Sequence, residues 1–266
     1  MNDVNRGLVI IGAGNVGQQL GLALKEAGYP ILQVMSRSRK SAERLAEKLG
    51  VDFTMDRDKI VRDAGMYLVC VNDDAMEEVV AGMNPAGKCI VHTSGSTPLD
   101  LLKNYTTECG VLYPFQTISR IYKPDFKKIP LLVEASTTSL EEVLLTLARR
   151  LSDIVQPMDS RQRQLLHLSA VFACNFSNHM YACAKSLLDA NGISFAMLHP
   201  LILETARKAM RIDPKEAQTG PAVRNDSLTI EKQRAMLEPF PELQKLYTFV
   251  TGSITSFHFP DAEKIQ

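Results

Sequence analysis

Short apolar runs alternate with helical patterns through the first half of the chain. The run at residues 8–11 is followed by apolar residues at three- and four-residue spacing over 16–27, which is typical of a helix with one buried face. A second run at 31–35 precedes another helical pattern that ends near residue 49. This order predicts strand, helix, strand and helix, joined by short connections.

Further apolar runs continue the alternation to about residue 156. They occupy residues 66–71, 88–91, 110–113, 130–133 and 154–156, and a helical pattern at 139–151 separates the last two. Strands that are apolar throughout are typical of a sheet covered by helices on both faces. The sequence therefore predicts an α/β fold with a doubly wound, mostly parallel sheet.

The pattern changes near Pro157. Residues 159–191 contain no proline or glycine, which predicts one helix of about 30 residues and about 45 Å. Further helical patterns occupy residues 194–211, 226–237 and 240–257. We therefore expect two domains, 1–157 and an all-helical 158–266. A helix longer than a small domain needs a large surface to pack against, and a second copy of the chain is the simplest one, so we expect a homodimer formed through the helical domain.

The first apolar run leads directly into the sequence Gly12-Ala13-Gly14-Asn15-Val16-Gly17. This Gly-x-Gly-x-x-Gly spacing between a strand and a helix is typical of the Rossmann turn that binds a dinucleotide pyrophosphate. Gly12 permits the turn, Gly14 lets the backbone approach the phosphates, and Gly17 lets helix and sheet pack closely. The helix N-terminus adds free N–H groups and partial positive charge. All six residues are predicted to bind the cofactor; the alternative is an ordinary turn with incidental glycines.

The end of the second predicted strand indicates which dinucleotide binds. NAD sites usually place a carboxylate there, but this chain reads Ser36-Arg37-Ser38-Arg39-Lys40. Cations and hydroxyl groups suit a 2′-phosphate, and arginine can bind it with paired hydrogen bonds. The sequence therefore predicts NADP, bound by Ser36, Arg37 and Ser38. The alternative is a solvated basic helix start with Ser36 or Ser38 as the helix cap.

Ligands of a doubly wound sheet bind beyond the carboxyl ends of its strands. Val71 and Asn72 follow one strand and are expected to border the cofactor. His92 and Ser94 follow the next strand, so we expect His92 to contact the cofactor and Ser94 to contact the nicotinamide or substrate. The alternative for this second loop is a capped helix start, with Ser96 or Thr97 as the cap and Pro98 at the first helical position.

The long predicted helix carries His167 and, eight residues later, Asn175. This spacing puts both on roughly one face, two turns apart. Imidazole titrates near neutral pH, which suits proton donation to a carbonyl or imine that receives a hydride. We therefore expect His167 to be the proton donor and Asn175 to orient the substrate. The alternative is a core histidine that hydrogen-bonds a backbone carbonyl.

One irregular polar stretch, residues 219–226, interrupts the helical half. It contains Gly220-Pro221, which breaks a helix, and then Arg224 and Asp226. An arginine on a loop can bind a carboxylate or phosphate, so Arg224 is expected to hold an anionic end of the substrate. Asp226 is expected to cap the helix that follows. The alternative for Arg224 is an exposed loop charge.

Composition narrows the class of protein. The 266 residues carry 30 basic and 30 acidic side chains, which argues against a nucleic-acid or membrane-surface protein. The five cysteines are scattered, and neither Cys-x-x-Cys nor a Cys/His metal spacing occurs, so no metal site is expected. No segment has the length and apolarity of a membrane span, and the start lacks a signal-peptide pattern. We expect reduced thiols in a cytoplasmic protein that binds a small molecule.

Four motifs together resemble a bacterial family of NADP oxidoreductases with a Rossmann-like domain and a C-terminal helical domain of unknown function. They are the glycine turn, His92-Thr93-Ser94-Gly95, Tyr113-Pro114-Phe115-Gln116, and Thr219-Gly220-Pro221-x-x-Arg224-x-Asp226. The layout is more distantly similar to pyrroline-5-carboxylate reductase and to the 6-phosphogluconate and β-hydroxyacid dehydrogenases. These relatives imply a dimer built through the helical domain, with the active site between the two domains.

The chain departs from those relatives at two positions. The dehydrogenases carry a catalytic Lys on the first long helix with Asn one turn later, whereas here Lys185 is followed one turn later by Asp189, and position 167 is His. Their lysine mechanism is therefore not carried over. The family motif that resembles Tyr113-Pro114 often begins with His, which argues against Tyr113 as the proton donor.

These observations predict an NADP(H)-dependent oxidoreductase that transfers hydride to a small, anionic C=O or C=N substrate. His167, Ser94, Asn175 and Arg224 are the expected catalytic residues. Two other functions stay open. One is a dinucleotide-binding sensor or scaffold without chemistry, and the other is hydride exchange between NADP and a flavin or deazaflavin coenzyme.

Overall fold

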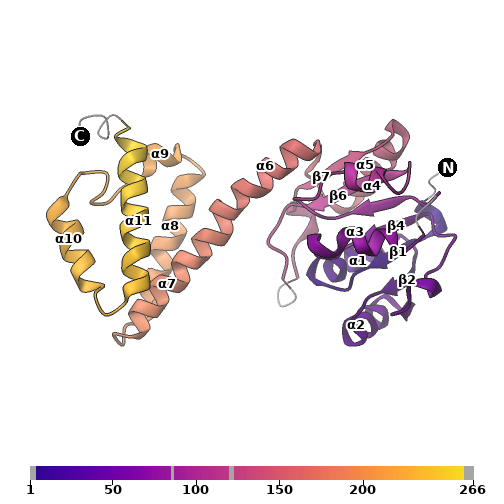
Figure 1. Ribbon diagram of the computed structural model, residues 1–266, viewed down its shortest axis with the longest axis horizontal. Helices are drawn as coiled ribbons and strands as arrows, with labels where there is room; N and C mark the ends of the chain where they lie inside the picture. Colours follow the sequence, from indigo (N-terminus) through magenta and orange to yellow (C-terminus); the bar gives the residue numbers. More distant parts are fainter. Residues whose placement is uncertain (1–3, 85–86, 120–122, 261–266) are drawn as a thin grey trace. The chain divides into compact units, whose positions relative to one another are not determined.

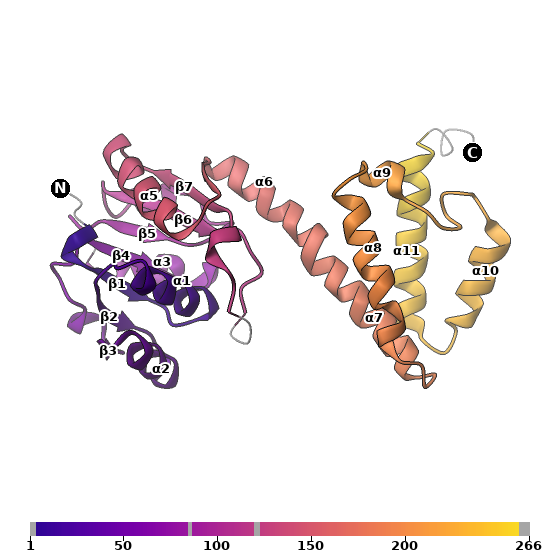
Figure 2. The same ribbon diagram turned by 180° about the vertical axis from the view of Figure 1, so that it is seen from behind.

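The computed structural model describes residues 4–84, 87–119 and 123–260 (Figures 1 and 2). They form two compact units, Met1–Asn175 and Phe176–Gln266, and each is described by itself. The division falls within the long helix, whereas the sequence pattern changes before it, at residue 157.

The first unit is built on a single eight-stranded sheet in the order β3-β2-β1-β4-β5-β6-β7-β8. Among the described strand pairs only β6 and β7 are antiparallel, so β7 and β8, which are parallel to each other, run opposite to the other six strands. The strands are β1 Leu8–Ile11, β2 Ile31–Met35, β3 Asp52–Thr54, β4 Met66–Val69, β5 Ile90–His92, β6 Cys109–Pro114, β7 Leu131–Ala135 and β8 Val155–Pro157. The predicted α/β fold is confirmed, and only the three-residue β3 was not predicted.

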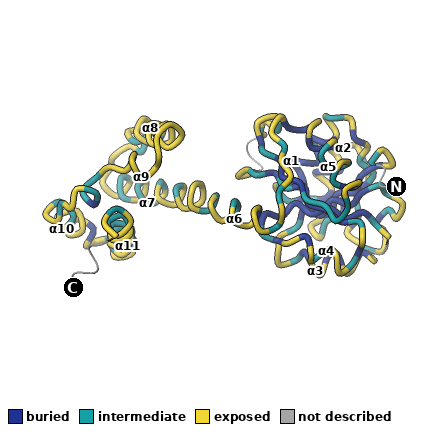
Figure 3. The backbone as a smooth tube through the Cα atoms, turned by 90° about the horizontal axis from the view of Figure 1, so that it is seen from above, coloured by how far each residue is buried: buried dark blue, intermediate teal, exposed yellow. Residues whose placement is uncertain are grey.

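Helices cover both faces of this sheet, as Figure 3 shows. On one face lie α1 (Asn15–Glu26), α2 (Arg39–Leu49) and α5 (Thr138–Leu151), and on the other lie α3 (Asp73–Ala81) and α4 (Asp100–Lys103). In β1, Leu8 and Ile10 pack on the first face while Val9 and Ile11 pack on the second. This alternation explains why the strand is apolar at every position.

The long helix is continuous but not uniform. It consists of α6 (Ser160–Ala170), a π-helical segment (Val171–Phe176) and α7 (Ser177–Asp189). Asp159 starts α6 with a capping box, and Gly192 follows the end of α7 with a positive φ of 68°. The extent of the helix agrees with the prediction, whereas the π segment had no signal in the periodicity.

The described residues of the second unit form helices and the loops between them. After α7 it contains a 3-10 turn (Phe195–Leu198), α8 (His199–Ala209), α9 (Pro214–Ala217), α10 (Ser227–Met236) and α11 (Pro241–His258). Only Ala222 and Leu237 are buried among the described residues of this unit, and Figure 3 shows its helices as exposed or half-buried. The predicted helices are confirmed, and the four-residue α9 was not predicted.

In the described parts of the chain, no helix combines the length and the hydropathy that crossing a bilayer requires.

Candidate functional site

The three glycines of the first turn have different surroundings. A Cβ at Gly12 would lie 2.4 Å from the Cys70 carbonyl oxygen, and Gly12 has a φ of 101°. A Cβ at Gly17 would lie 2.0 Å from the Gly12 carbonyl oxygen. At Gly14, in contrast, a Cβ would meet nothing within 4 Å. Gly12 and Gly17 therefore shape the turn, and Gly14 faces the open space that a pyrophosphate needs.

Two neighbouring cavities form a trough across the carboxyl ends of β1, β2, β4 and β5. Their volumes are about 280 Å³ and 570 Å³, and both are lined by Gly14, Cys70, Val71 and Asn72. The first continues toward the end of β2 and the second toward the end of β5. A trough that passes over the N-terminus of α1 in this way fits a dinucleotide with its pyrophosphate at the glycine turn.

Ser36, Arg37 and Ser38 line the cavity at the end of β2, together with Ser41. None of the described residues that line it is a carboxylate. The Ser38 hydroxyl also accepts a hydrogen bond from the Ser41 N–H at 3.4 Å, so it caps α2 as well. Hydroxyl groups and an arginine, with no carboxylate among the described lining residues, suit a 2′-phosphate, so this end of the trough fits NADP.

The second cavity brings together side chains from several loops and from α6. Its lining includes Asn72 and Asp73 at the start of α3, Ser94 and Gly95 after β5, and His167. Asn72 occupies the N-cap position of α3 without a side-chain capping bond. The cavity therefore collects three of the residues expected from the sequence, Asn72, Ser94 and His167, beside the glycine turn.

Ser94 has a structural role in addition to its place in the cavity. Its hydroxyl oxygen accepts hydrogen bonds from the N–H groups of Ser96 at 3.1 Å and Thr97 at 2.9 Å. The following helix, α4, starts only at Asp100. The expectation that Ser96 or Thr97 caps a helix beginning at Pro98 is therefore wrong, because Ser94 orders this loop.

His92 is not among the described residues that line this cavity. The side chain is fully buried, and its Nδ1 accepts a hydrogen bond from the Ser94 N–H at 3.1 Å. Burial, assisted by the charge of Arg163, lowers the pKa of His92 to about 3. The structure thus places His92 as a neutral support for the Ser94 loop, and the direct cofactor contact expected from the sequence stays a prediction.

His167 pairs with a residue that the sequence reasoning set aside. Its Nδ1 lies 2.9 Å from the Tyr113 hydroxyl, and the two rings meet edge to face with centroids 6.0 Å apart. Both side chains are half-buried. The alternative of a core histidine bonded to a backbone carbonyl is wrong for this nitrogen, because its partner is a phenol. The position of Tyr113 near the carboxyl end of β6 was the signal that could have identified it.

Asn175 lies in the π-helical segment and is exposed. A π turn contains about one residue more than an α turn. One α turn and one π turn together therefore span about eight residues, which is the separation of His167 and Asn175. The π segment therefore keeps Asn175 close to the helix face that carries His167. Its role in orienting a substrate stays a prediction.

Arg224 belongs to the second unit, where it is exposed in the loop before α10. In the same loop, the Asp226 carboxylate accepts a hydrogen bond from the Thr229 N–H at 3.1 Å and caps α10, as expected. The hydrogen bonds from Thr229 lower the pKa of Asp226. Contact between Arg224 and a substrate stays a prediction.

A buried ion pair, which the sequence did not indicate, holds α6 against the sheet. Arg163 on α6 is fully buried and pairs with Glu134 on β7. Its Nη2 donates to the Thr97 carbonyl oxygen at 2.6 Å, and Ser160 donates to Glu134 at 2.8 Å. These bonds join α6, one turn before His167, to the loop that begins at Ser94.

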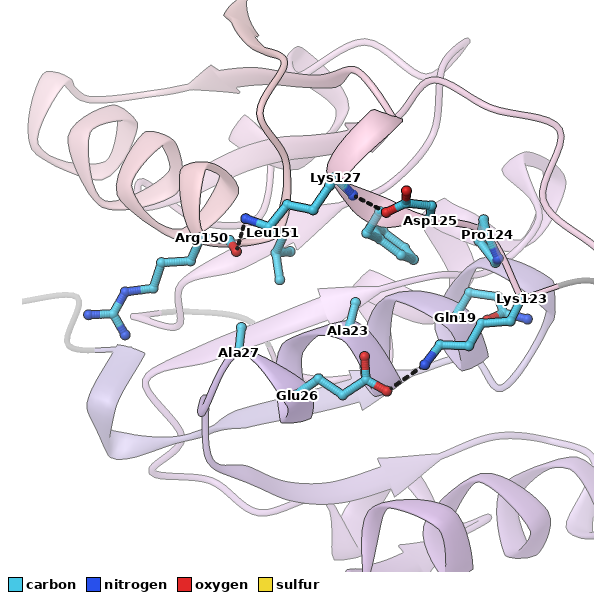
Figure 4. Close-up of a pocket in the computed structure, with 11 residues that line it drawn as sticks. Gln19, Ala23, Glu26, Ala27, Lys123, Pro124, Asp125, Lys127, Arg150 and Leu151 are labelled. Atoms are coloured by element: carbon cyan, nitrogen blue, oxygen red, sulfur yellow. Dashed lines mark hydrogen bonds and ion pairs between the residues drawn. The ribbon is translucent and has the colours of Figure 1, made fainter.

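Another cavity, of about 310 Å³, lies beside the C-terminal half of α1 (Figure 4). Figure 4 shows Lys123 reaching Glu26, with a distance of 2.7 Å between the charged atoms, while Lys127 donates to the Arg150 carbonyl oxygen at 3.2 Å. None of the motifs found in the sequence contributes to it. Across the described residues, no group of three or more His, Cys, Asp or Glu side chains could hold a metal ion.

Family models match both halves of the chain. A model described as "NADP oxidoreductase coenzyme F420-dependent" matches residues 7–95, and one described as a domain of unknown function matches residues 129–254. No curated protein matches the chain.

Several solved structures resemble the whole chain. The "putative NADP oxidoreductase BF3122" from Bacteroides fragilis shares 42% identity with a TM-score of 0.89, over 96% of this chain and 99% of that one. An imine reductase from Myxococcus stipitatus in complex with NADP+ shares 17% identity and a TM-score of 0.65, over 97% and 95% of the two chains. A pyrroline-5-carboxylate reductase from Coxiella burnetii shares 14% identity and a TM-score of 0.54, over 95% and 99%. The last two show a shared fold.

Proposed function

Because the chain belongs to the NADP oxidoreductase family of the Bacteroides fragilis protein, we propose that it uses NADPH to reduce a small carbonyl or imine compound. The observation that carries this proposal is the position of His167. Its imidazole lines the same cavity as the glycine turn, Asn72 and Ser94. A group that can donate a proton therefore lies where the nicotinamide end of the cofactor is expected.

Each part of the trough has a separate task in this proposal. The backbone N–H groups from Gly12 to Gly17 bind the pyrophosphate, and Ser36, Arg37 and Ser38 bind the 2′-phosphate. NADPH, when bound, supplies the hydride. Asn72 and Ser94 border the nicotinamide, and His167 holds the proton that the substrate oxygen or nitrogen takes up.

The substrate is proposed to be anionic, with Arg224 and Asn175 as its further ligands. An exposed guanidinium on a loop can pair with a carboxylate or phosphate in two parallel hydrogen bonds. Arg224→Ala should therefore raise KM for an anionic substrate more than for its neutral ester or amide. Arg211→Ala, which removes another exposed arginine of the same unit, is the matched control.

The direct test measures oxidation of NADPH in a single turnover with a panel of keto acids and cyclic imines, with a deazaflavin as a further acceptor. Hydroxy acids are tested in the reverse direction, by reduction of NADP+. His167→Ala should slow the step by about 100-fold or more, because general acid catalysis contributes that much. His179→Ala on α7 is the control. An unchanged rate in His167→Ala would exclude this histidine as the acid.

The same panel separates the enzyme from a dinucleotide-binding sensor. A sensor binds NADPH and leaves every member of the panel unreduced. Turnover confined to the deazaflavin would support hydride exchange between two coenzymes and would contradict the proposed carbonyl or imine substrate.

We further propose that the helical unit forms a homodimer. Within residues 176–260 only Ala222 and Leu237 are buried, whereas Met197, Met210 and Phe249 are 74%, 78% and 76% exposed. Exposed apolar surface of this extent is typical of an interaction site, and a second copy supplies a matching one. Sedimentation velocity should find twice the chain mass, and a monomer at micromolar concentration would contradict the proposal.

A further inference from the structure

The contact between Tyr113 and His167 forms over a position without a side chain. Gly95 is buried in the loop after β5, and its φ lies outside the left-handed region, so backbone conformation does not require glycine there. A Cβ at Gly95 would lie 2.7 Å from His167 Nδ1 and 2.8 Å from the Tyr113 hydroxyl oxygen. Glycine is therefore needed because the two rings meet directly above it.

We propose that Tyr113 is a positioning residue that selects the tautomer of His167, so that Nε2 carries the proton available to a substrate. The Tyr113 hydroxyl lies 2.9 Å from His167 Nδ1, and one of the two atoms must donate. A phenol donates a hydrogen bond more strongly than it accepts one, so the favoured arrangement of the neutral imidazole has the phenol donating to Nδ1 and the ring proton on Nε2. Nε2 is then the ring nitrogen left for a ligand in the cavity.

A hydroxyl partner serves both protonation states of the ring. If the imidazole takes up a second proton, Nδ1–H donates to the phenol oxygen, because a hydroxyl can also accept. Nε2–H stays in place in either state. A backbone carbonyl at this position would keep a proton on Nδ1 in both protonation states, and a backbone N–H could not bond to the cation, so neither could replace the phenol.

The surroundings keep Tyr113 in its protonated form. Burial raises the pKa of Tyr113, the charge of Asp73 raises it further, and the charge of Arg163 opposes these effects. Asp73 on α3 lines the same cavity as His167, and Arg163 lies one turn earlier on α6. The hydroxyl therefore remains a donor over the range in which imidazole titrates.

The catalytic meaning of this arrangement rests on the proposed function, but its geometry can be measured without a substrate. In the full-length protein with NADPH, ¹⁵N NMR of the histidine rings distinguishes a protonated ring nitrogen from an unprotonated one, and His167→Ala assigns the signals. The wild type should show the neutral ring of His167 with Nε2 protonated and Nδ1 unprotonated. Tyr113→Phe should give a mixture of both tautomers. Tyr105→Phe removes a hydroxyl that bonds to Glu77 at the surface and should leave the spectrum unchanged.

A second variant tests the contact between the two rings without removing the Tyr113 hydroxyl. Gly95→Ala keeps both rings and forces them apart, so it should give the same mixture of tautomers as Tyr113→Phe. A wild-type ring protonated on Nδ1, or an unchanged tautomer in both variants, would overturn the proposal.

Turnover gives an independent measurement once a substrate is found. Tyr113→Phe should lower kcat by about tenfold or more while KM for NADPH is unchanged, because the proton donor is disturbed and the cofactor site is not. A wild-type kcat in Tyr113→Phe, with His167→Ala inactive, would overturn the positioning role and leave the proposed function intact. If no compound is reduced, the proposed function fails and the tautomer measurement alone decides this inference.

Discussion

The two units of this chain differ in where their large apolar side chains lie. In the first unit, side chains such as Leu8, Ile10 and Leu68 are at most 1% exposed between the sheet and its helices. In the second unit, Leu201 and Phe249 are 62% and 76% exposed. Since burial of apolar surface is the main favourable term in folding, the first unit has an interior of its own and the second does not.

This difference assigns different sources of stability to the two units. The first unit should fold from its own contacts, and the same buried contacts support the trough that fits the cofactor. The second should depend on contacts with another chain, so its stability should change with protein concentration. Hydrogen exchange read by mass spectrometry can follow α5 and α11 separately and measure each unit by itself.

The largest expected effect breaks the interior of the first unit. Glu134→Ala removes the partner of the buried Arg163 and leaves its charge uncompensated, which should cost about 3–5 kcal/mol. Exchange should become faster in α5 and the rest of the first unit. Asp100→Ala, which removes an exposed ion pair with Lys103, should cost less than about 1 kcal/mol. Equal losses in the two variants would contradict the difference between buried and exposed pairs.

Cofactor binding should stabilise the first unit selectively. NADPH at 100 times its Kd should add about 2.7 kcal/mol to the free energy of unfolding of the unit that binds it. NADH at the same concentration should add less, and Arg37→Glu should remove this preference because it places a carboxylate at the predicted 2′-phosphate site. If wild type already prefers NADH, the assignment of Ser36, Arg37 and Ser38 is wrong. Equal protection of α11 by NADPH would show that the two units unfold together.

A charge at an exposed apolar position of the second unit should affect only that unit. Phe249→Asp should weaken the proposed dimer by about 2 kcal/mol, or about 30-fold in Kd, because an interface would bury the new charge without a partner. Met55→Asp is the matched control, since Met55 is 47% exposed in the first unit. The midpoint of unfolding of α11 should also fall on dilution of the wild type. A midpoint independent of concentration would mean that the second unit is stable by itself.

The sequence predicted those parts of the structure that have a strong local signal. The apolar runs at 8–11 and 31–35 and the glycine turn identified the sheet and the cofactor end because these signals are local. The strand Asp52–Thr54 and the helix Pro214–Ala217 were missed because three or four residues contain too little periodicity.

The site was less predictable because its decisive contacts are long-range. Tyr113 and His167 are 54 residues apart in the sequence, and Glu134 and Arg163 are 29 apart. Nothing within either local segment shows that these side chains meet. His92 shows another limit of a local signal: its place after a strand indicated a ligand contact but not that the fold buries its side chain and pairs its Nδ1 with the Ser94 N–H. Its contact with the cofactor stays a prediction.

The smallest expected effect near neutral pH comes from this buried histidine, and it sharpens the comparison because it grows as the pH falls. The pKa of His92 falls from 6.5 in the unfolded chain to about 3 in the fold, so between these values only the unfolded state takes up the proton. Its contribution to stability is complete above about pH 6.5 and declines as the pH falls, by about 1.4 kcal/mol per pH unit. Among the described residues its Nε2 has no hydrogen-bond partner, so nothing there stabilises an added proton.

His92→Asn should therefore flatten the acid side of the stability curve of the first unit, since an amide oxygen can still accept from the Ser94 N–H but does not titrate. His199→Asn, at an exposed position of the second unit, should leave both curves unchanged. Urea unfolding followed by hydrogen exchange at several pH values measures the two slopes. If His92→Asn and wild type lose stability in parallel on acidification, the buried His92 ring does not cause the acid sensitivity of the first unit. Acid sensitivity would then not distinguish the first unit from the second.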